Sequence, residues 1–514
     1  MIDNLLKVGA YILAAYGLYV VFVLVRYKYD DYVAARHGCA VPFYSDREMP
    51  IGIKGSYMTM KSLWNSTILD FFQERISEAR TVRTVVSGQR WFITIEPDNA
   101  RTVLATSFKD YSLGFRYESF FPLLGNGIFT LSGEGWKHSR SMLRPQFSRE
   151  QVSHLRSIGE HLDILMRRFT NGSKDGGTVD AQALYHQLTL DTATEFLFGS
   201  SSNTLDEKTT TIKAPRGEVS NAQFAESFTS CLLTLATRVV LGSLYWVYSP
   251  PGFKKNVEVC HNFVDYYVQK ALEKPMGPDD TADRYVFINE LTKETQDPIV
   301  IRDQAFNILL AGRDTTAALL SYCTFYLGRN KDVYKRLRES ILADFGEGHE
   351  NITFESLKRS KFLQNIINET LRLHPIVPLN FRTAIRDTKL PVGGGPNQDQ
   401  PLFVPKGTNI FYLPYVMQRH PRYWGEDANE FKPDRWDDPE TQRHTWDYIP
   451  FNGGPRICLG QQFALTEASY ALVRVAQTFK DINIVHPAPN EPLRQIMRLT
   501  SSVLGGVEAN FVPA

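Results

Sequence analysis

The sequence predicts a mainly α-helical protein with small β-sheets (α+β), preceded by a single N-terminal transmembrane helix. Residues 8–25 carry no charge, and at 1.5 Å per residue such a run spans about 27 Å of hydrocarbon, enough for a thin membrane. From about Ile68 onward apolar residues recur mostly at helical spacing, with short strand-like runs such as residues 90–95 between them. A mostly apolar stretch from Asp297 to Gly328 is long enough for one helix that crosses the whole body.

The residues that flank the apolar run indicate its orientation. Lys7 precedes the run, whereas Arg26, Lys28 and Arg36 follow it, so the excess of positive charge places the bulk of the chain in the cytosol. A cleaved signal peptide is a competing interpretation, but the N-terminal region carries little positive charge and no small-x-small cleavage site follows. A buried core helix is the other alternative. We expect a membrane anchor over residues 1–28.

The remainder of the chain divides into a linker and one body. Proline and glycine punctuate a polar stretch after the anchor, which predicts a hinge over residues 29–66. We expect residues 67–514 to form a single globular domain. The polar stretches at 172–216 and 274–283 have the composition of surface loops rather than of domain linkers.

The bulk composition excludes some classes of function. Of the 514 residues 43% are hydrophobic, and 57 basic against 56 acidic residues leave a formal charge of +1, so there is no global attraction to nucleic acid. The five cysteines are widely scattered and include no C-x-x-C pair that would predict zinc or a dithiol redox site. We therefore expect a reduced, cytosol-facing domain that binds no nucleic acid.

The most informative segment is a glycine-rich loop with the pattern Phe-x-x-Gly-x-Arg-x-Cys-x-Gly, which runs from Phe451 to Gly460 and presents Cys458. Glycine lets the backbone approach other groups closely and adopt positive φ. Loop N–H groups that point at a sulfur lower its basicity. Alone, Cys458 would be interpreted as a buried structural thiol, because free cysteine is among the most buried residue types. Within this loop a role as metal ligand is favoured.

This loop resembles the haem-binding signature of the cytochrome P450 monooxygenases. The resemblance implies the fold of that family, haem b (iron protoporphyrin IX) as cofactor, and Cys458 as the thiolate ligand of the haem iron, with Phe451 among the haem-binding residues. A thiolate ligand donates electron density to iron and favours O–O cleavage. On this resemblance, residues 67–514 are a haem-binding catalytic domain.

Polar residues interrupt the long central helix, for which Asp297 is a plausible N-cap and Pro298 a first turn. Gly312 removes a side chain, and Asp314 and Thr315 place an acid and a hydroxyl in an apolar course, where helix propensity does not favour them. In the resembled family this segment serves oxygen activation, with Thr315 and Asp314 as the proton-delivering catalytic residues. The alternative is a solvated polar turn on a surface helix.

A Glu-x-x-Arg pattern begins at Glu369, and its i, i+3 spacing puts Arg372 on the same helical face. An exposed pair of this kind is common and contributes only tenths of a kcal/mol. In the resembled family the pair is buried and completed by a later arginine, here Arg435. Because removing one partner of a buried ion pair is strongly destabilising, the resemblance implies a structural role for these residues.

Haem carries two propionates, which need cations or other hydrogen-bond donors. Trp136 and Arg140 offer an indole N–H and a guanidinium at i, i+4 on one predicted helix face, and the resemblance implies that they are propionate partners. Arg382 and Arg456 are further candidates by position. Each arginine taken alone is more often a surface residue than a ligand.

The sequence contains no flavin or nicotinamide motif, so the electrons must come from a separate protein. The resemblance implies NADPH–cytochrome P450 reductase as that partner, with cytochrome b5 as a second candidate donor. It also implies a single-pass protein of the endoplasmic reticulum membrane whose catalytic domain faces the cytosol. The lipid bilayer is then a further partner of the chain.

The stretch from the cysteine loop through Glu467 resembles the fungal subfamily that hydroxylates n-alkanes and fatty acids at their terminal carbon. The expected pocket walls suit an apolar small molecule, so a membrane-bound terminal (omega) hydroxylase of fatty acids or n-alkanes is predicted. Ala311 stands where related animal enzymes often carry a glutamate that esterifies the haem, and no such ester is expected. The alternatives are a tailoring oxidase of a fungal polyketide or terpenoid pathway, a haem-thiolate isomerase or dehydratase that needs no reductase, and a non-catalytic haem carrier.

Overall fold

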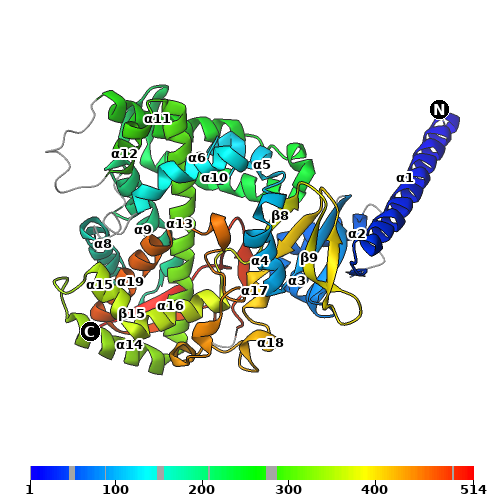
Figure 1. Cartoon of the computed structure of the whole chain (residues 1–514). Coiled ribbons are helices and arrows are strands. Elements are labelled where there is room, and N and C mark those ends of the chain that lie inside the picture. Colours follow the sequence, from blue (N-terminus) through cyan, green and yellow to red (C-terminus); the bar gives the residue numbers. More distant parts are fainter. Residues whose placement is uncertain are drawn as a thin grey trace.

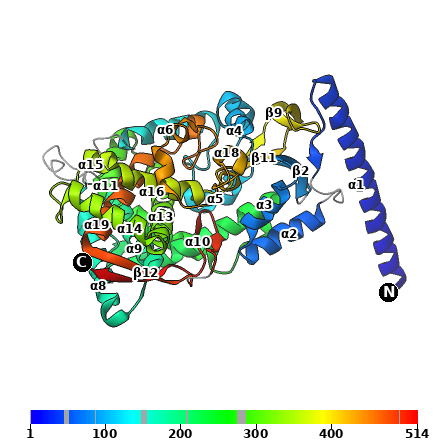
Figure 2. The ribbon, with the colours of Figure 1, turned by 90° about the horizontal axis from the view of Figure 1, so that it is seen from below.

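The computed structural model describes residues 2–44, 52–86, 88–147, 155–206, 209–273, 286–488 and 491–514. This part of the chain is mainly helical, and its largest sheet lies on the side from which the N-terminal helix projects (Figures 1 and 2). The arrangement confirms the predicted class, mainly α with small β-sheets.

The N-terminal helix α1 spans Ile2–Arg36 and extends away from the body (Figure 1). Its segment from residue 7 to residue 36 is long and apolar enough to cross a membrane, and 6% of its most apolar window is buried. It is the one such helix in the described ranges, and it indicates membrane anchoring. Residues 29–36, which the sequence assigns to the linker, continue this helix.

The largest sheet has six strands in the order β1-β2-β3-β11-β8-β4. They are β1 (Phe43–Tyr44), β2 (Thr81–Val86), β3 (Gln89–Thr94), β11 (Asn409–Tyr412), β8 (Asn380–Ala384) and β4 (Tyr111–Ser112). β2 and β3 form an antiparallel hairpin, whereas β11 pairs with β3 in parallel and with β8 antiparallel. The sheet packs against α2 (Ile53–Trp64) and α3 (Ile68–Ile76), where Phe72 contacts the ring of Phe411. The pairing of β11 with both β3 and β8 thus places β8, which carries Arg382, in the same sheet as strands from the first hundred residues.

The central helix α13 spans Pro298–Arg329 and is 32 residues long. As the sequence predicts, Asp297 caps it: its Oδ1 accepts the N–H of Ile299 at 2.8 Å and of Val300 at 3.4 Å. Helices on several sides bury most of α13 against the main hydrophobic core (Figure 1). The principal helical partners of α13 are α9 (Ala181–Phe198), α11 (Phe253–Glu273), α16 (Lys361–Leu373) and α19 (Gln461–Thr478). α8 (Arg156–Gly172) packs against α9 and α19, and α10 (Asn221–Leu241) packs against α11.

Shorter elements complete the body. The remaining helices are α4 (Pro97–Arg101), α5 (Arg116–Leu124), α6 (Gly133–Leu143), α12 (Phe287–Glu294), α14 (Lys331–Phe345), α15 (Phe354–Arg359), α17 (Pro414–Met417) and α18 (Pro421–Trp424). The remaining strands are β5 (Val179–Asp180), β6 (Thr211–Ala214), β7 (Gly217–Ser220), β9 (Thr388–Gly394), β10 (Gln400–Val404), β12 (Phe479–His486), β13 (Gln495–Met497), β14 (Ser501–Val503) and β15 (Glu508–Pro513). They pair in small sheets outside the six-stranded one.

Candidate active site

Cys458 lies in a tight loop that leads into α19. The backbone N–H of Cys458 donates to the carbonyl of Phe451 at 3.0 Å, which closes the loop. Gly454 has φ +66°, and a Cβ there would lie 2.0 Å from the carbonyl oxygen of Leu104, so only glycine fits this position. The phenyl group of Phe451 is half-buried and packs against the main core. The loop therefore holds the sulfur in a fixed place.

The sulfur of Cys458 faces an opening inside the protein. The residue is exposed, and yet protein atoms surround the sulfur densely enough that burial raises the pKa of the thiol. The two observations agree if the accessible surface belongs to an enclosed space rather than to the outer face. The backbone N–H of Gly460 and the charge of Arg140 act in the opposite direction and lower the pKa of this thiol. A metal cation in the opening would favour the thiolate outright.

Four guanidinium groups, named here the arginine cluster, gather beside this loop: Arg116, Arg140, Arg382 and Arg456. Their hydrogen bonds go to uncharged oxygens, among them Asn380 Oδ1 at 2.7 Å, Ile457 O at 3.0 Å, Phe381 O at 2.7 Å and Leu131 O at 2.8 Å. Burial and then repulsion by the other three members lower the pKa of Arg456 to about 9. The cluster is thus a concentration of positive charge without a neutralising partner among the contacts of these described residues.

Buried donors without partners accompany the arginine cluster. The indole Nε1 of Trp136 and the Nε of Arg382 are buried and have no hydrogen-bond partner among the residues that the structure describes. The Arg456 guanidinium lies 4.4 Å from the centre of the Trp136 ring, so the indole belongs to the same group. Buried donors left unpaired destabilise a folded protein. This place therefore favours an anionic acceptor of hydrogen bonds, such as a carboxylate.

The middle turn of α13 is open on one side. Residues 310–315 are partly exposed, although the flanking parts of the helix are buried. The nearest neighbour that a Cβ on Gly312 would meet is the methyl group of Ala193, at 3.8 Å. The hydroxyl of Thr315 donates to the carbonyl of Ala311 at 2.7 Å, which keeps it on the helix and leaves its oxygen free to accept a hydrogen bond.

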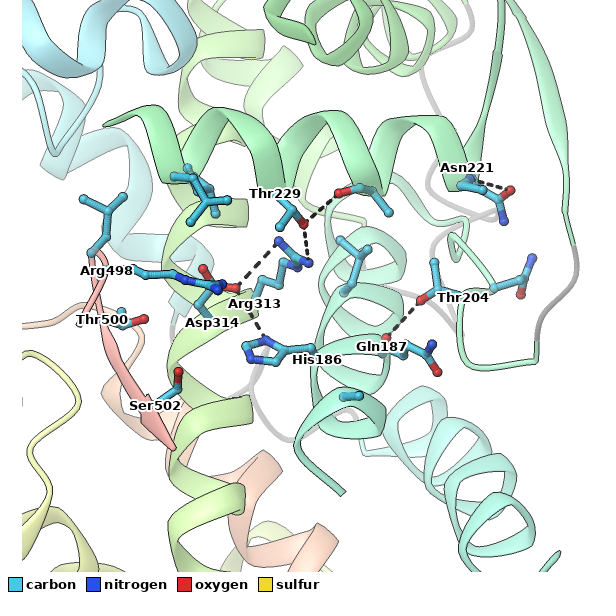
Figure 3. Close-up of a pocket in the computed structure, with 18 of the residues that line it drawn as sticks. His186, Gln187, Thr204, Asn221, Thr229, Arg313, Asp314, Arg498, Thr500 and Ser502 are labelled. Carbon is cyan, nitrogen blue, oxygen red and sulfur yellow. Dashed lines mark hydrogen bonds and ion pairs between the residues drawn. The ribbon is translucent and has the colours of Figure 1, made fainter. Parts of the chain in front are cut away.

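Asp314 lines an open pocket of about 480 Å³ between α9, α10, α13 and the turn before β14 (Figure 3). Its Oδ1 lies 3.6 Å from His186 Nδ1 and 3.7 Å from Arg313 Nη1. Arg313 in turn donates to the hydroxyl of Thr229 at 2.9 Å. Burial lowers the pKa of His186 below its ordinary value, in spite of the nearby carboxylate. No hydrogen bond joins the described side chains of Asp314 and Thr315, so the two neighbours face different surroundings.

The Glu-x-x-Arg residues form a buried ion cluster together with Arg435. Glu369 and Arg372 are fully buried, and Arg372 Nε and Nη2 donate to the two Glu369 oxygens at 2.8 Å each. Arg435 Nε approaches Glu369 Oε1 at 3.4 Å, and the indole of Trp436 donates to Oε2 at 3.1 Å. Arg372 also donates to the carbonyl of Gln418 at 2.9 Å. Every charge in this cluster is paired, and the cluster braces the chain that leads to the cysteine loop.

Comparison with known proteins identifies this architecture. The family model for cytochrome P450 matches residues 57–503. The chain belongs to the cytochrome P450 family. Relatives include cytochrome P450 52E1 of Candida apicola, 57% identical over 93% of this chain and 93% of that protein, and cytochrome P450 52-E3 of Starmerella bombicola, 58% identical over the same shares. Cytochrome P450 52A12 of Debaryomyces hansenii is 44% identical over 94% of this chain and 95% of that protein.

Solved structures agree on the fold. The crystal structure of the cytochrome P450DA haem domain matches with a TM-score of 0.75 at 21% identity, over 92% of this chain and 98% of that one. Family and fold make this cytochrome P450 a haem-dependent monooxygenase that draws electrons from a redox partner. The exposed sulfur, the arginine cluster and the unpaired donors fit a metal macrocycle that carries two carboxylates.

The structure brings most of the sequence-predicted residues of this cytochrome P450 together and adds others. Trp136, Arg140 and Arg456 lie side by side. Arg116 was missed, because a lone arginine between aromatic residues carries no spacing signal. Its hydrogen bond to Asn380 on β8 brings it beside the other arginines. His186 was missed for the same reason, since nothing in its helix marks it as the neighbour of Asp314.

Proposed function

We propose that this cytochrome P450 hydroxylates the terminal (omega) carbon of fatty acids or n-alkanes. The observation that carries the proposal is its similarity, at up to 58% identity, to yeast relatives of the cytochrome P450 52 group, together with the resemblance of the stretch through Glu467 to fungal terminal hydroxylases. Partly buried apolar side chains of Phe129, Leu310 and Leu499 pack against one hydrophobic cluster and supply walls for an apolar substrate.

In this proposal the chain itself holds the haem. Cys458 supplies the thiolate ligand, and Phe451 fixes the loop by accepting the Cys458 N–H at 3.0 Å. The arginine cluster and the free indole N–H of Trp136 hold the propionates, which satisfies donors that are otherwise unpaired. Bound haem supplies the activation of oxygen and its transfer to a C–H bond.

Thr315 and Asp314 divide the handling of protons between two sides of α13. The Thr315 hydroxyl lies in the open middle turn and donates to Ala311 O at 2.7 Å. Its oxygen can therefore accept a hydrogen bond from a proton donor on the reaction side. Asp314 faces the pocket between α9 and α10, where His186 and Arg313 are its neighbours. Its carboxylate takes up protons from the pocket and resupplies the threonine turn, with water as the connection between them.

Glu369, Arg372 and Arg435 take no part in the chemistry. Their buried ion cluster ties α16 to the segment around Trp436, since the Lys432 N–H donates to Glu369 Oε1 at 2.9 Å and the Trp436 indole to Oε2 at 3.1 Å. The cysteine loop follows this segment in the chain. The cluster therefore maintains the form of the protein that accepts haem.

The electron donor is NADPH–cytochrome P450 reductase, with cytochrome b5 as a second donor. The proposal is supported by the lack of a flavin or nicotinamide motif in the sequence. The enzyme resides in the endoplasmic reticulum membrane as a single-pass protein, with α1 in the bilayer and residues 67–514, the haem-binding domain, in the cytosol. The charges after the apolar run support this orientation.

The test is a substrate screen with the full-length enzyme and reductase, in which products from fatty acids, n-alkanes, polyketides and terpenoids are identified by mass spectrometry. We expect NADPH-dependent terminal alcohols from the first two classes. Products from polyketides or terpenoids alone would favour a tailoring oxidase. Turnover without NADPH would favour an isomerase or dehydratase, and oxygen consumption that no compound stimulates would favour a haem carrier.

The proton-handling role is tested separately. Thr315→Ala should raise hydrogen peroxide per NADPH consumed by about tenfold, because general acid catalysis contributes at least that much. Thr315→Ser retains the hydroxyl and is the matched control, and its coupling should stay near that of the unmodified enzyme. Equal coupling in the alanine variant and the unmodified enzyme would remove Thr315 from the mechanism.

A further inference from the structure

One face of α1 is covered by the catalytic domain where the helix leaves the predicted membrane segment. Val23, Asp30 and Ala34 are buried and Tyr27 is half-buried, whereas most residues between them are exposed. Spacings of three and four residues place these side chains in one stripe along the helix. The domain thus packs along the side of the helix and does not merely follow its end.

The centre of this contact is a buried ion cluster. The Asp30 carboxylate accepts a hydrogen bond from Arg90 and lies 3.6 Å from the Arg83 guanidinium. The side chains of Asp30, Arg83 and Arg90 are 10%, 5% and 11% exposed. Arg83 also stacks over the Tyr27 ring at 4.6 Å and donates to the Tyr44 hydroxyl at 3.2 Å. The two arginines come from the β2–β3 hairpin, so the cluster joins the anchor helix directly to the six-stranded sheet.

The chain that follows α1 is fastened as well. The N–H of Ala40 donates to Pro401 O at 2.9 Å, and Lys389 Nζ donates to His37 O at 2.7 Å. Cys39 packs into a small hydrophobic cluster with Phe403. Together with the ion cluster, these contacts hold residues 37–44, which connect the helix to the sheet, against the catalytic domain.

The contact reaches the level of the predicted membrane segment. A Cβ on Gly88, in the turn between β2 and β3, would lie 3.6 Å from the Tyr19 hydroxyl. A Cβ on Gly242, at the start of the short helix η5 (Gly242–Val247), would lie 3.4 Å from Gln89 Oε1 in the same hairpin. In η5 the side chain of Trp246 is 67% exposed. Amphipathic aromatic residues favour the headgroup layer of a bilayer.

We propose that Asp30, Arg83 and Arg90 clamp the anchor helix at one fixed angle to the catalytic domain, which holds the β2–β3 turn against the lipid headgroups. Without Asp30, two buried guanidiniums would face each other uncompensated, and the contact would open. The proposal depends on α1 lying in the bilayer, but it is independent of the substrate, so its failure and that of the proposed hydroxylation can be told apart.

The experiment uses the full-length haem-loaded enzyme in phosphatidylcholine nanodiscs. Spin labels are introduced as unnatural amino acids at the exposed positions Leu18 in α1 and Arg101 in α4. Pulsed EPR should give one narrow distance distribution for the unmodified sequence. Asp30→Asn should widen it about twofold or more, because relative motion of linked parts is the default once their contact is lost. Asp31→Asn removes the neighbouring acid outside the cluster and should leave the distribution narrow.

Two further measurements decide the interpretation. Asp30→Glu retains the charge and should keep a narrow distribution, and Arg90→Gln replaces Asp30→Asn if the latter fails to bind haem. A spin label at Leu244 in η5 should be relaxed mainly by oxygen dissolved in the lipid. In Asp30→Asn, relaxation by oxygen should fall and relaxation by a water-soluble nickel complex should rise. A broad distribution in the unmodified enzyme, or an equally narrow one in Asp30→Asn or in the Arg90→Gln variant that replaces it, would overturn the proposal.

Discussion

Two groups of buried charge in this cytochrome P450 differ in whether an opposite charge of the protein neutralises them. In the ion cluster of Glu369, Arg372 and Arg435, both arginines contact the Glu369 carboxylate, at 2.8 Å from Arg372 and 3.4 Å from Arg435. In the arginine cluster, cations repel one another strongly enough to contribute to a pKa of about 9 at Arg456. The first group is complete within the polypeptide, whereas the second requires anions that the described residues do not provide.

The difference separates folding residues from cofactor residues. A paired buried charge stabilises the form in which it is paired, so its loss affects the fold with or without haem. An unpaired buried charge destabilises the haem-free protein. In our proposal the propionates neutralise this charge, so its loss should affect the two forms in opposite directions. Substitutions in the two clusters can therefore be compared directly.

The largest effect is expected for Glu369→Gln. The change leaves the fully buried Arg372 without its carboxylate, and breaking a buried pair in this way costs about 3–5 kcal/mol. We expect little haem-loaded protein and a lower midpoint in urea unfolding. Asp434→Asn, on the exposed chain beside the same segment, serves as the control and should behave almost as the unmodified enzyme. Similar stability of the two variants would show that the buried cluster does not hold the fold.

A smaller, pH-dependent effect is expected for Glu467→Gln. Glu467 is buried and accepts a hydrogen bond from Thr192 at 2.6 Å, and burial raises its pKa from 4.5 to about 7. Between these values the folded protein binds more protons than the unfolded chain, so the free energy of unfolding falls as pH rises from about 4.5 to about 7, by roughly 3 kcal/mol. The glutamine variant lacks this fall. Urea unfolding at pH 5 and pH 8 checks it, and parallel curves for both proteins would contradict the expected titration.

Arg116→Gln distinguishes the arginine cluster from the paired one. The change removes a buried cation, whose pKa burial and Arg382 lower to about 10, and leaves an uncharged hydrogen-bond donor in its place. The haem-free protein should gain about 1 kcal/mol of stability, while the loaded protein should release haem faster to a scavenger protein. A variant destabilised in the haem-free form, with unchanged haem release, would place Arg116 outside the propionate site.

The smallest effect is expected at an exposed pair. Arg336 contacts Asp434 at 2.8 Å, and the two side chains are 52% and 48% exposed. Exposed pairs contribute about 0–1 kcal/mol, so Arg336→Ala should shift the urea midpoint barely above experimental error. An effect close to that of Glu369→Gln would show that burial does not set the scale for charges in this protein.

The sequence predicted features encoded over short distances and failed where distant segments meet. The Asp297 cap and the closure of the loop around Cys458 follow from contiguous residues. The direction in which Asp314 points does not follow from contiguous residues, because the helices that pack around α13 determine what each of its faces meets. Arg116 and the clamp at Asp30 were equally hidden, since their partners lie on strands remote in the chain. The helix containing Asp30 runs on to Arg36, past the expected end of the anchor at residue 28.

The most direct test of the account is the carbon monoxide difference spectrum of the reduced, haem-loaded enzyme. Cys458 presents an accessible sulfur beside the arginine cluster, and a thiolate on the iron gives the Soret band a characteristic red shift. We predict that shift in the unmodified protein and its loss in Cys458→Ser. Absence of the thiolate band in the unmodified protein, or its persistence in the serine variant, would contradict the assignment of Cys458.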